Sequence, residues 1–309
     1  MNAPPATPPV DDHVFLLGRP PIAEFLGFIQ TMAAEGRTAN QGQLTAEWRK
    51  ANDHVINLEK VEAAFADNPP TQQIPAELQP LAAQVLDHPF FRRSFQFVPT
   101  DLLMVDLDRL VVFQKFINLG FVGNLRASFG ATPTPEEVFR LAMSMDRGWQ
   151  PVTVGQTAPN SFSFVAPSKD FRFLEATLLR PDQVSDYPAS GPTAAILGLA
   201  VGHGSNLLNA FHVDGRLVLN NGSHRAYALR DMGVSQAPCV VQHITRRDEL
   251  DLIGSQDLQL NPDRYLKSAR PPVLKDYFDE RLRKVVQVPR KNRLLRVSFT
   301  VEQTEIPAA

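Results

Sequence analysis

The sequence predicts an α+β fold, in which a small mixed sheet with helices is preceded by a mainly helical region. Apolar residues recur at helical spacing through much of residues 13–148. Residues 209–244, by contrast, read as strand, turn, strand, helix and strand in succession. The 309 residues include 26 prolines, which divide the chain into many short elements. We therefore expect one or two domains built from short helices and strands.

Composition narrows the classes of function. Hydrophobic residues make up 43% of the chain and charged residues 21%, which is ordinary for a globular protein. The net charge of −2 produces no overall field that attracts nucleic acid, so nucleic acid is disfavoured as a partner. No apolar run reaches the roughly 18 residues of a membrane span, and no secretory signal is recognised. With a single cysteine, Cys239, we expect a cytoplasmic protein without membrane contact.

The first part of the chain is expected to be a tail followed by a mainly helical domain. Residues 1–12 contain four prolines and no core-forming pattern, which is typical of a disordered tail. Residues 13–148 form the helical domain, whose role the sequence does not reveal and whose surface is a candidate for a protein partner. Residues 110–117 read as a strand or a helix start, and the pattern over 109–118 suits a helix. Other helices are expected at residues 22–34, 44–65, 75–86 and 133–145, and strands at 13–17 and 102–107.

A linker is expected between this region and the rest of the chain. Residues 149–169 are rich in Pro, Thr, Ser and Gly and show no sustained period, although residues 162–165 suit a short strand. The linker therefore separates the helical domain from a second domain at residues 170–245.

The C-terminal residues 246–309 are expected to pack on that second domain. Helical patterns occur at residues 246–258 and 273–283, and residues 298–301 suit a closing strand. The only basic cluster lies at residues 284–296. We interpret it as a solvated pair of strands, with a phosphate- or nucleic-acid-binding patch as the alternative.

The stretch that organises the prediction is residues 209–244. Asp214-Gly215 is a strong signal for a hairpin turn between two strands. Gly222 can adopt the positive φ that a strand-to-helix junction often needs, and Gly233 can end a helix as a C-cap. Helical spacing is expected from residue 224 to residue 232, followed by a strand at residues 239–241.

Polar residues gather at the junction between strand and helix in this stretch. At the N-terminus of a helix, backbone N–H groups and the helix dipole favour a bound anion, often a phosphate. An imidazole and a guanidinium in the first turn add donors for the same charge. The alternative is an ordinary polar helix cap. The residues concerned are Asn220, Asn221, Ser223, His224 and Arg225.

The run DGRLVLNNGSHRAYALRDMGVSQAPCVV resembles the signature of the ParB/sulfiredoxin superfamily, also called the ParB-like nuclease domain. Gly222, His224 and Arg225 match the G-x-H-R form of that signature. The preceding strand, the following helix and the later Pro-x-Val-Val also match in order. The resemblance covers residues 171–244 and implies a nucleotide, ATP or CTP, whose phosphates are held by Asn221, Gly222, Ser223, His224 and Arg225.

The resemblance also implies elements and roles upstream. Residues 171–179 resemble the family's first strand, and residues 193–201 resemble the helix that follows. Glu175 on that strand would be the catalytic acid or base and a ligand for Mg²⁺, with Asp182 and Asp214 as alternatives, and His224 would be a second catalytic residue. The implied reaction is magnesium-dependent phosphoryl transfer or nucleotide hydrolysis by an ATP- or CTP-dependent phosphotransferase or hydrolase.

The sequence departs from the sulfiredoxin pattern at one important position. Sulfiredoxins carry a reactive cysteine just before the histidine, where this chain has Ser223. Reduction of a sulfinic acid is therefore not expected. The alternative to an enzyme is a non-catalytic module that binds a nucleotide and, through it, gates the binding of a protein or nucleic-acid partner.

Histidines provide the remaining candidate site. His203, His212, His224 and His243 fall within one predicted domain but at no regular interval, so a zinc site is disfavoured. His212 and His243 lie on apolar strands. We interpret them as satisfied core or edge histidines and keep a metal cluster as the alternative.

Overall fold

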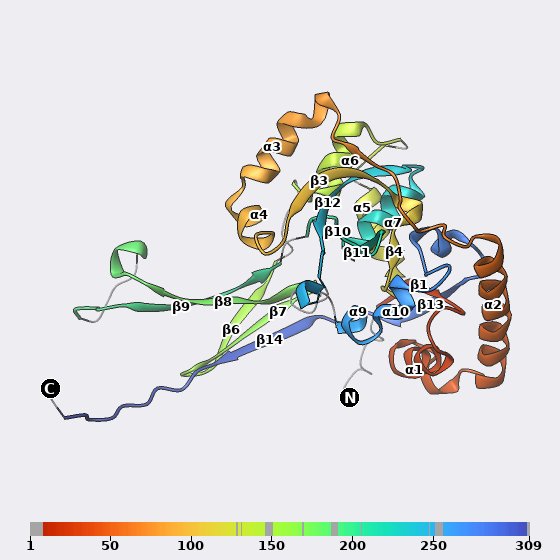
Figure 1. The fold of residues 1–309 in the computed structure, drawn as a ribbon. Helices are drawn as coiled ribbons and strands as arrows, with labels where there is room; N and C mark the ends of the chain where they lie inside the picture. The colour runs from red at the N-terminus through yellow and green to blue at the C-terminus, as the bar shows by residue number, and fades with distance from the viewer. Residues whose placement is uncertain are drawn as a thin grey trace. The chain divides into compact units, whose positions relative to one another are not determined.

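The computed structural model shows an α+β chain whose internal contacts divide it into two units (Figure 1). Unit 1 comprises Met1–Arg147 and Asn206–Arg290, and unit 2 comprises Gly148–Ser205 and Lys291–Ala309. Each unit is therefore built from two separate stretches of the chain. The structure describes residues 9–127, 129–130, 132–145, 151–168, 170–186, 191–204, 206–246, 248–250 and 256–307.

Unit 1 contains a six-stranded mixed sheet in the order β2-β3-β12-β10-β11-β4. The β10–β12 and β11–β4 pairs are parallel, and the other neighbours are antiparallel. The sheet thus joins strands from the first half of the chain to the predicted stretch 209–244. Its strands are β2 (Thr71–Gln73), β3 (Thr100–Asp106), β12 (Gln236–His243), β10 (Asn209–Val213), β11 (Arg216–Asn221) and β4 (Val111–Val112).

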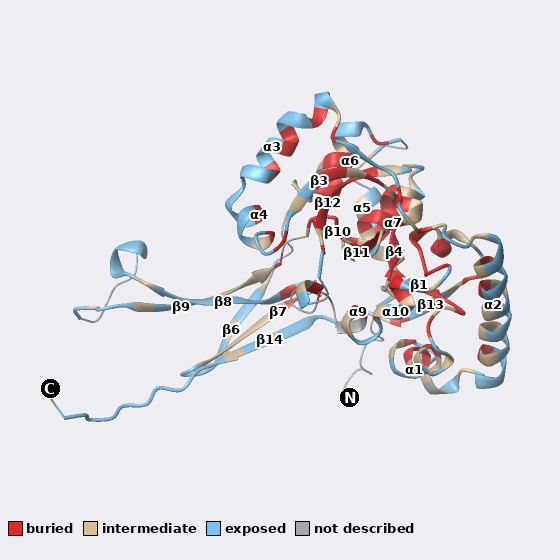
Figure 2. Cartoon of the chain, viewed as in Figure 1, coloured by how far each residue is buried: buried red, intermediate tan, exposed pale blue. Residues whose placement is uncertain are grey.

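Helices cover this sheet and complete its core. Apolar residues of β3, β12, α6 and α7 belong to the same buried cluster, and Figure 2 shows buried residues concentrated there. Helix α6 begins with a capping box, in which the side chains of Thr134 and Glu137 each accept from the other residue's backbone N–H. This pair of residues is a local sequence signal for the start of a helix. The helices are α3 (Gln79–Asp87), α4 (Pro89–Ser94), α5 (Leu119–Arg126), α6 (Pro135–Ala142) and α7 (Ser223–Asp231).

A second, three-stranded sheet in unit 1 joins the two ends of the chain. Strand β1 (Val10–Leu16) pairs with both β13 (Arg283–Pro289) and β5 (Phe116–Asn118). Helices α1 (Ile22–Met32) and α2 (Gln41–Val61) contribute to the buried cluster around this sheet. Residues 13–148 consequently do not form a separate helical domain, because their strands share both sheets with strands from the C-terminal half. Of the predicted tail, residues 10–12 belong to β1, and residues 1–8 lie outside the described residues.

The buried Arg270 links residues 270–276 to Glu62, the residue that follows α2. The Arg270 side chain is fully buried, and its guanidinium donates to Asp276 at 2.7 and 2.8 Å and to Glu62 at 2.9 Å. Two carboxylates balance the buried charge, as a buried ion pair requires. The short helices nearby are the 3-10 helix Leu274–Phe278, α9 (Gln256–Leu260) and α10 (Pro262–Leu266).

Unit 2 consists mainly of strands. β14 (Arg293–Ser298), β7 (Ser161–Ala166) and β6 (Thr153–Ala158) form a three-stranded antiparallel sheet. β8 (Phe171–Leu179) and β9 (Ile196–His203) form a two-stranded antiparallel ribbon. The base of the ribbon is held by Phe171, which is buried and whose ring lies 6.2 Å from that of Phe164 on β7.

The α+β class and most of the predicted elements are confirmed. Helices overlap the predicted ranges 22–34, 44–65, 75–86 and 133–145, and residues 209–244 show the predicted order of strand, turn, strand, helix and strand. The turn residues Asp214 and Gly215 both have positive φ, of 49° and 72°, as a tight hairpin requires.

Two helical predictions are wrong. Residues 109–118 contain β4 and β5, so the strand alternative for residues 110–117 holds, and residues 193–201 lie largely in β9. Leu110, Val111 and Val112 are all buried, and a short run that is apolar on every side cannot be assigned by periodicity.

The C-terminal predictions are met only in part. Residues 273–283 contain a single 3-10 helix. Of the predicted helix at 246–258, residues 248–250 and 256–258 are helical, and residues 247 and 251–255 lie outside the described residues. The two strands within residues 283–298 do not pair with each other, since β13 pairs with β1 and β14 with β7. Among the described residues, no helix has both the length and the apolar character needed to cross a bilayer.

Candidate functional site

The predicted phosphate site lies in unit 1, where β11 ends and α7 begins. Asn221 is the last residue of β11, and Gly222 follows with a φ of 93°. A Cβ atom on Gly222 would lie 2.8 Å from Cδ1 and 3.0 Å from Cα of Leu208. Glycine is therefore required here both by its conformation and by the close approach of the neighbouring backbone.

Helix α7 starts without a side-chain cap. The amides of Arg225 and Ala226 donate to the carbonyl oxygen of Gly222 at 2.9 and 2.8 Å, and the first turn contains no acidic residue. Ser223 and His224 at this end are half-buried and thus partly open to solvent. The positive end of the helix dipole, roughly half an elementary charge, is consequently not neutralised by a carboxylate from its own first turn.

Arg225 points into the protein. Its side chain is only 3% exposed, Nη1 donates to the carbonyl oxygen of Ala142 at 3.4 Å, and Nη2 donates to Oδ1 of Asn206. These contacts tie the end of α6 and residue 206 to α7. In this structure the guanidinium that the sequence assigned to a phosphate therefore has intramolecular partners.

His224 is also engaged within the protein. Its Nε2 accepts a hydrogen bond from the backbone N–H of Asn118 at 3.0 Å, and the edge of its ring meets Phe121 at 5.4 Å between centroids. A nitrogen that accepts from an amide carries no proton, so this contact implies a neutral ring with its hydrogen on Nδ1. Its donor toward a ligand would be Nδ1–H, and a charged imidazolium would lose the contact with Asn118.

The neighbouring helix α5 offers a direct comparison. Helices α5 and α7 run side by side in the same direction, since Asn118 contacts His224 at one end and Arg126 pairs with Asp231 at the other. At the start of α5 a carboxylate is already present, because Asp11 accepts from the Asn118 side chain at 3.2 Å.

Asp11 is held there as an anion. Burial acts to raise its pKa, but hydrogen bonds from Arg290, at 2.7 Å, and Asn118 outweigh burial, so the pKa of this carboxyl is lowered. A carboxylate thus lies against the start of α5, where it also pairs with Arg290, whereas the first turn of α7 contains no acidic residue.

Glu175 belongs to unit 2, whereas the residues of the turn belong to unit 1. It is exposed on β8 and pairs with Ala200 of β9, next to a shift in register. Of the alternatives, Asp182 is exposed in unit 2 and bonded to Arg180 at 3.1 Å. Asp214 occupies the hairpin turn, at the end of β11 opposite to Gly222. Within the described ranges, no three His, Cys, Asp or Glu side chains form a group that could hold a metal ion.

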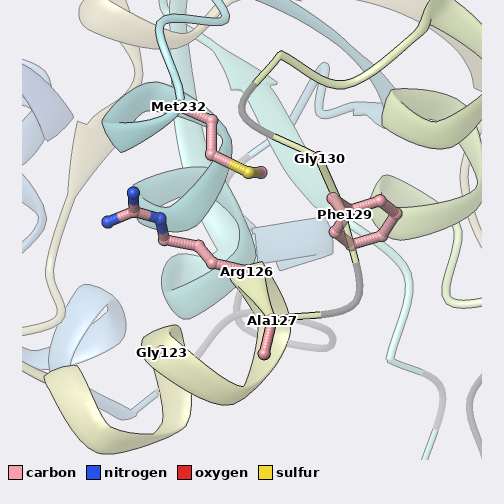
Figure 3. A pocket seen from close by; sticks show the side chains of 6 residues that line it. All are labelled: Gly123, Arg126, Ala127, Phe129, Gly130 and Met232. Atoms are coloured by element: carbon pink, nitrogen blue, oxygen red, sulfur yellow. The ribbon is translucent and has the colours of Figure 1, made fainter.

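An open hollow of about 330 Å³ lies elsewhere in unit 1. It is found at the C-terminal ends of α5 and α7, where the side chains of Phe129, Met232 and Arg126 stand around it (Figure 3). A nine-residue helix is about 13 Å long, so this hollow lies roughly that far from the start of α7. None of residues 221–225 lines it.

The sequence predicts the turn at residues 221–223, but it does not indicate which residues contact Arg225 and His224 beside it. Asn206 and Asn118 contact Arg225 and His224 from 19 and 106 positions away along the chain. No pattern near either asparagine indicates these contacts, because they arise only when α5 and the loop before β10 pack beside α7.

Comparisons with family models, with curated proteins and with solved structures found no match for this chain.

Proposed function

We propose that unit 1 binds a nucleoside triphosphate, ATP or CTP, with its phosphates at the turn 221–223 and the first turn of α7. The single observation that carries this proposal is the left-handed glycine entry to α7, where the N-cap residue Gly222 offers no side-chain cap and the first turn contains no acidic residue. The Gly222 N–H itself donates to Oδ1 of Asn221 at 2.7 Å, so the donors for a phosphate would come from the first turn of α7. A phosphate there would receive backbone N–H donors and interact favourably with the helix dipole.

The comparison with α5 supports this assignment. The parallel helix beside α7 has a carboxylate, Asp11, against its N-terminus. Both helix N-termini carry a partial positive charge. A bound phosphate would place a negative charge at the start of α7, as Asp11 does at the start of α5. Ser223, at the first position of α7, would add a hydroxyl donor.

Arg225 has a different role in this proposal from the one implied by the sequence. Its bonds to Ala142 and Asn206 hold the loop before β10 and the end of α6 against α7. It acts as a positioning residue that keeps the turn in shape. The family resemblance stays a hypothesis, supported by the order of elements within residues 209–244 but not by residues 193–201, which lie largely in a strand where the resemblance implies a helix.

A charge substitution at the start of α7 separates ligand binding from stability. Ser223→Asp places a negative charge where it stabilises the helix dipole but repels a phosphate. In a thermal-shift titration with ATP, CTP or inorganic triphosphate, we expect the melting temperature of the parent protein to rise with ligand concentration. The variant should retain its melting temperature without ligand and lose affinity at least tenfold.

The matched control is Gln41→Glu, which introduces the same charge at the first position of α2. It should leave nucleotide affinity unchanged. A parent protein whose melting temperature does not respond to millimolar nucleotide or triphosphate would refute the proposal, as would equal affinities in Ser223→Asp and the parent.

Two uses of the nucleotide are distinguished by a single assay. If the protein is a magnesium-dependent phosphotransferase or hydrolase, as the family resemblance implies, the parent should release phosphate or transfer it in the presence of Mg²⁺. If the nucleotide instead gates a binding partner, saturable binding should occur without turnover. Glu175→Gln tests the role that the family resemblance implies for this residue, and turnover equal to that of the parent would remove that role.

A further inference from the structure

Two histidines and an aspartate form a short chain of contacts at one end of the central sheet in unit 1. Nδ1 of His212 lies 3.2 Å from Nδ1 of His243, and Nε2 of His243 lies 2.9 Å from Oδ2 of Asp101. The two rings are nearly perpendicular, at 86°. They therefore meet through their nitrogens and not through their faces.

The sheet itself fixes this arrangement. His212 on β10 and His243 on β12 are directly paired in the parallel register, and Asp101 on β3 pairs with Val241 of β12. The amide of His243 also donates to the carbonyl oxygen of Pro99 at 2.8 Å. All three side chains are thus carried by adjacent strands, which hold them more firmly than a loop would.

The hydrogen positions follow from the carboxylate. Asp101 accepts a hydrogen bond from Nε2–H of His243, and in the neutral tautomer with that hydrogen Nδ1 of His243 presents a lone pair. The hydrogen between the rings then belongs to Nδ1 of His212. A cation could replace that hydrogen if the His212 ring shifted its proton to Nε2, and both rings would stay neutral.

From this geometry we infer that His212 and His243 bind a first-row divalent transition-metal ion, such as Zn²⁺ or Cu²⁺, through their two Nδ1 atoms. Two nitrogens that each lie about 2.0–2.1 Å from one tetrahedral ion are separated by about 3.3–3.4 Å. The observed 3.2 Å between the Nδ1 atoms is close to that separation. The two nitrogens are therefore already near the separation that binding requires, and the rings would turn so that both lone pairs face the ion.

Asp101 would be an outer-shell residue, which hydrogen-bonds a metal ligand and not the metal itself. A metal-bound histidine commonly donates its other ring N–H to a carboxylate, which fixes the tautomer and makes the ligating nitrogen more basic. The His243–Asp101 contact has this form. Asp101 thus positions His243 without touching the metal.

The imidazole ligands favour a transition-metal ion over Mg²⁺ or Ca²⁺. Imidazole nitrogens suit Zn²⁺, Cu²⁺ and Ni²⁺, whereas Mg²⁺ and Ca²⁺ require oxygen ligands. The side chain of His243 is 30% exposed and that of Asp101 is 63% exposed, so water can reach the site and fill the remaining coordination positions.

This inference does not depend on the proposed nucleotide site. His212 pairs with Leu217 near the hairpin turn, whereas the turn that enters α7 lies at the other end of β11. The metal experiment uses no nucleotide, so its failure and the failure of nucleotide binding are separate results.

The test is calorimetric titration of the full chain, without a polyhistidine tag, with Zn²⁺, and electron paramagnetic resonance with Cu²⁺. We expect one equivalent to bind and the Cu²⁺ spectrum to show two coordinating nitrogens. His212→Gln and His243→Gln should each lower affinity at least tenfold, and Asp101→Asn about 10- to 100-fold.

His88→Gln is the matched control, because His88 lies away from the site at the cap of α4 and accepts from the amide of Phe90. It should bind Zn²⁺ like the parent. Circular dichroism spectra equal to that of the parent will show that each variant folds. Zn²⁺ affinity that is absent in the parent, or that is unchanged in both His212→Gln and His243→Gln, would overturn the inference.

Discussion

Units 1 and 2 differ in how they bury apolar side chains. The three buried clusters found among the described residues are all built from unit 1. Of the 17 large hydrophobic side chains that are exposed in the described part of the chain, nine belong to unit 2, although it is much the shorter unit. A strand can thus form by backbone pairing alone, but a core needs strands and helices that share buried faces.

The β8–β9 ribbon illustrates the difference most clearly. Its register puts Phe173, Leu178, Leu197 and Val201 on one face, and Leu178 is 73% exposed. In unit 1, Leu217 on β11 is 1% exposed. The stabilisation from an apolar side chain scales with the area that it removes from water. A leucine should therefore contribute much to the free energy of unfolding in unit 1 and little in the ribbon of unit 2.

The largest expected effect comes from the same substitution in each unit. Leu217→Ala should lower the free energy of unfolding by about 2–5 kcal/mol, because it leaves a cavity in the core. Leu178→Ala should change it by no more than about 0.5 kcal/mol. Urea unfolding followed by circular dichroism measures both. A comparable loss in Leu178→Ala would show that the ribbon buries that face after all.

A smaller effect is expected at two glycines of unit 1 that flank α7. Gly233 has a φ of 85° with open space around it, so Gly233→Ala should cost only the strain of the left-handed conformation, about 1–2 kcal/mol. Gly222→Ala adds a collision with Leu208 and should cost more. The difference between the two free energies of unfolding isolates the close approach at the proposed phosphate turn. Equal costs would mean that Leu208 moves aside freely.

The smallest effect concerns acid stability in unit 1. Hydrogen bonds from Arg281 lower the pKa of Asp279, burial opposes them, and His54 of α2 at 2.9 Å adds to the lowering. The folded-state pKa lies below the ordinary value of 3.8, so the stabilisation is present above pH 3.8 and is lost as the pH falls below it.

Asp279→Asn should therefore make the pH dependence of unfolding shallower below pH 3.8, with little change in slope at neutral pH. Unfolding midpoints in urea between about pH 2 and pH 6 provide the measurement. Asp87→Asn, which removes the carboxylate of an exposed ion pair with Arg92, controls for the loss of charge. A parent-like slope in Asp279→Asn would show that other carboxylates govern acid unfolding.

The sequence by itself determined the element order of residues 209–244. The Asp214-Gly215 turn, the glycine before α7 and the glycine after it are local signals, since each depends on the backbone conformation of one or two residues. The start of α6 was predictable for the same reason, from a capping box within four residues. The position of Gly222 and Ser223 at a helix entry thus follows from the local sequence alone.

Only the tertiary structure decided which residues meet. Residues 111–112 and 116–118 became strands because they pair with β11 and β1, which come from distant parts of the chain. Packing likewise turned Arg225 inward, placed Glu175 in the other unit and paired His212 with His243. The physical reason is that turns and caps depend on neighbours in sequence, whereas strand pairing and side-chain partners depend on residues that approach only when the core forms.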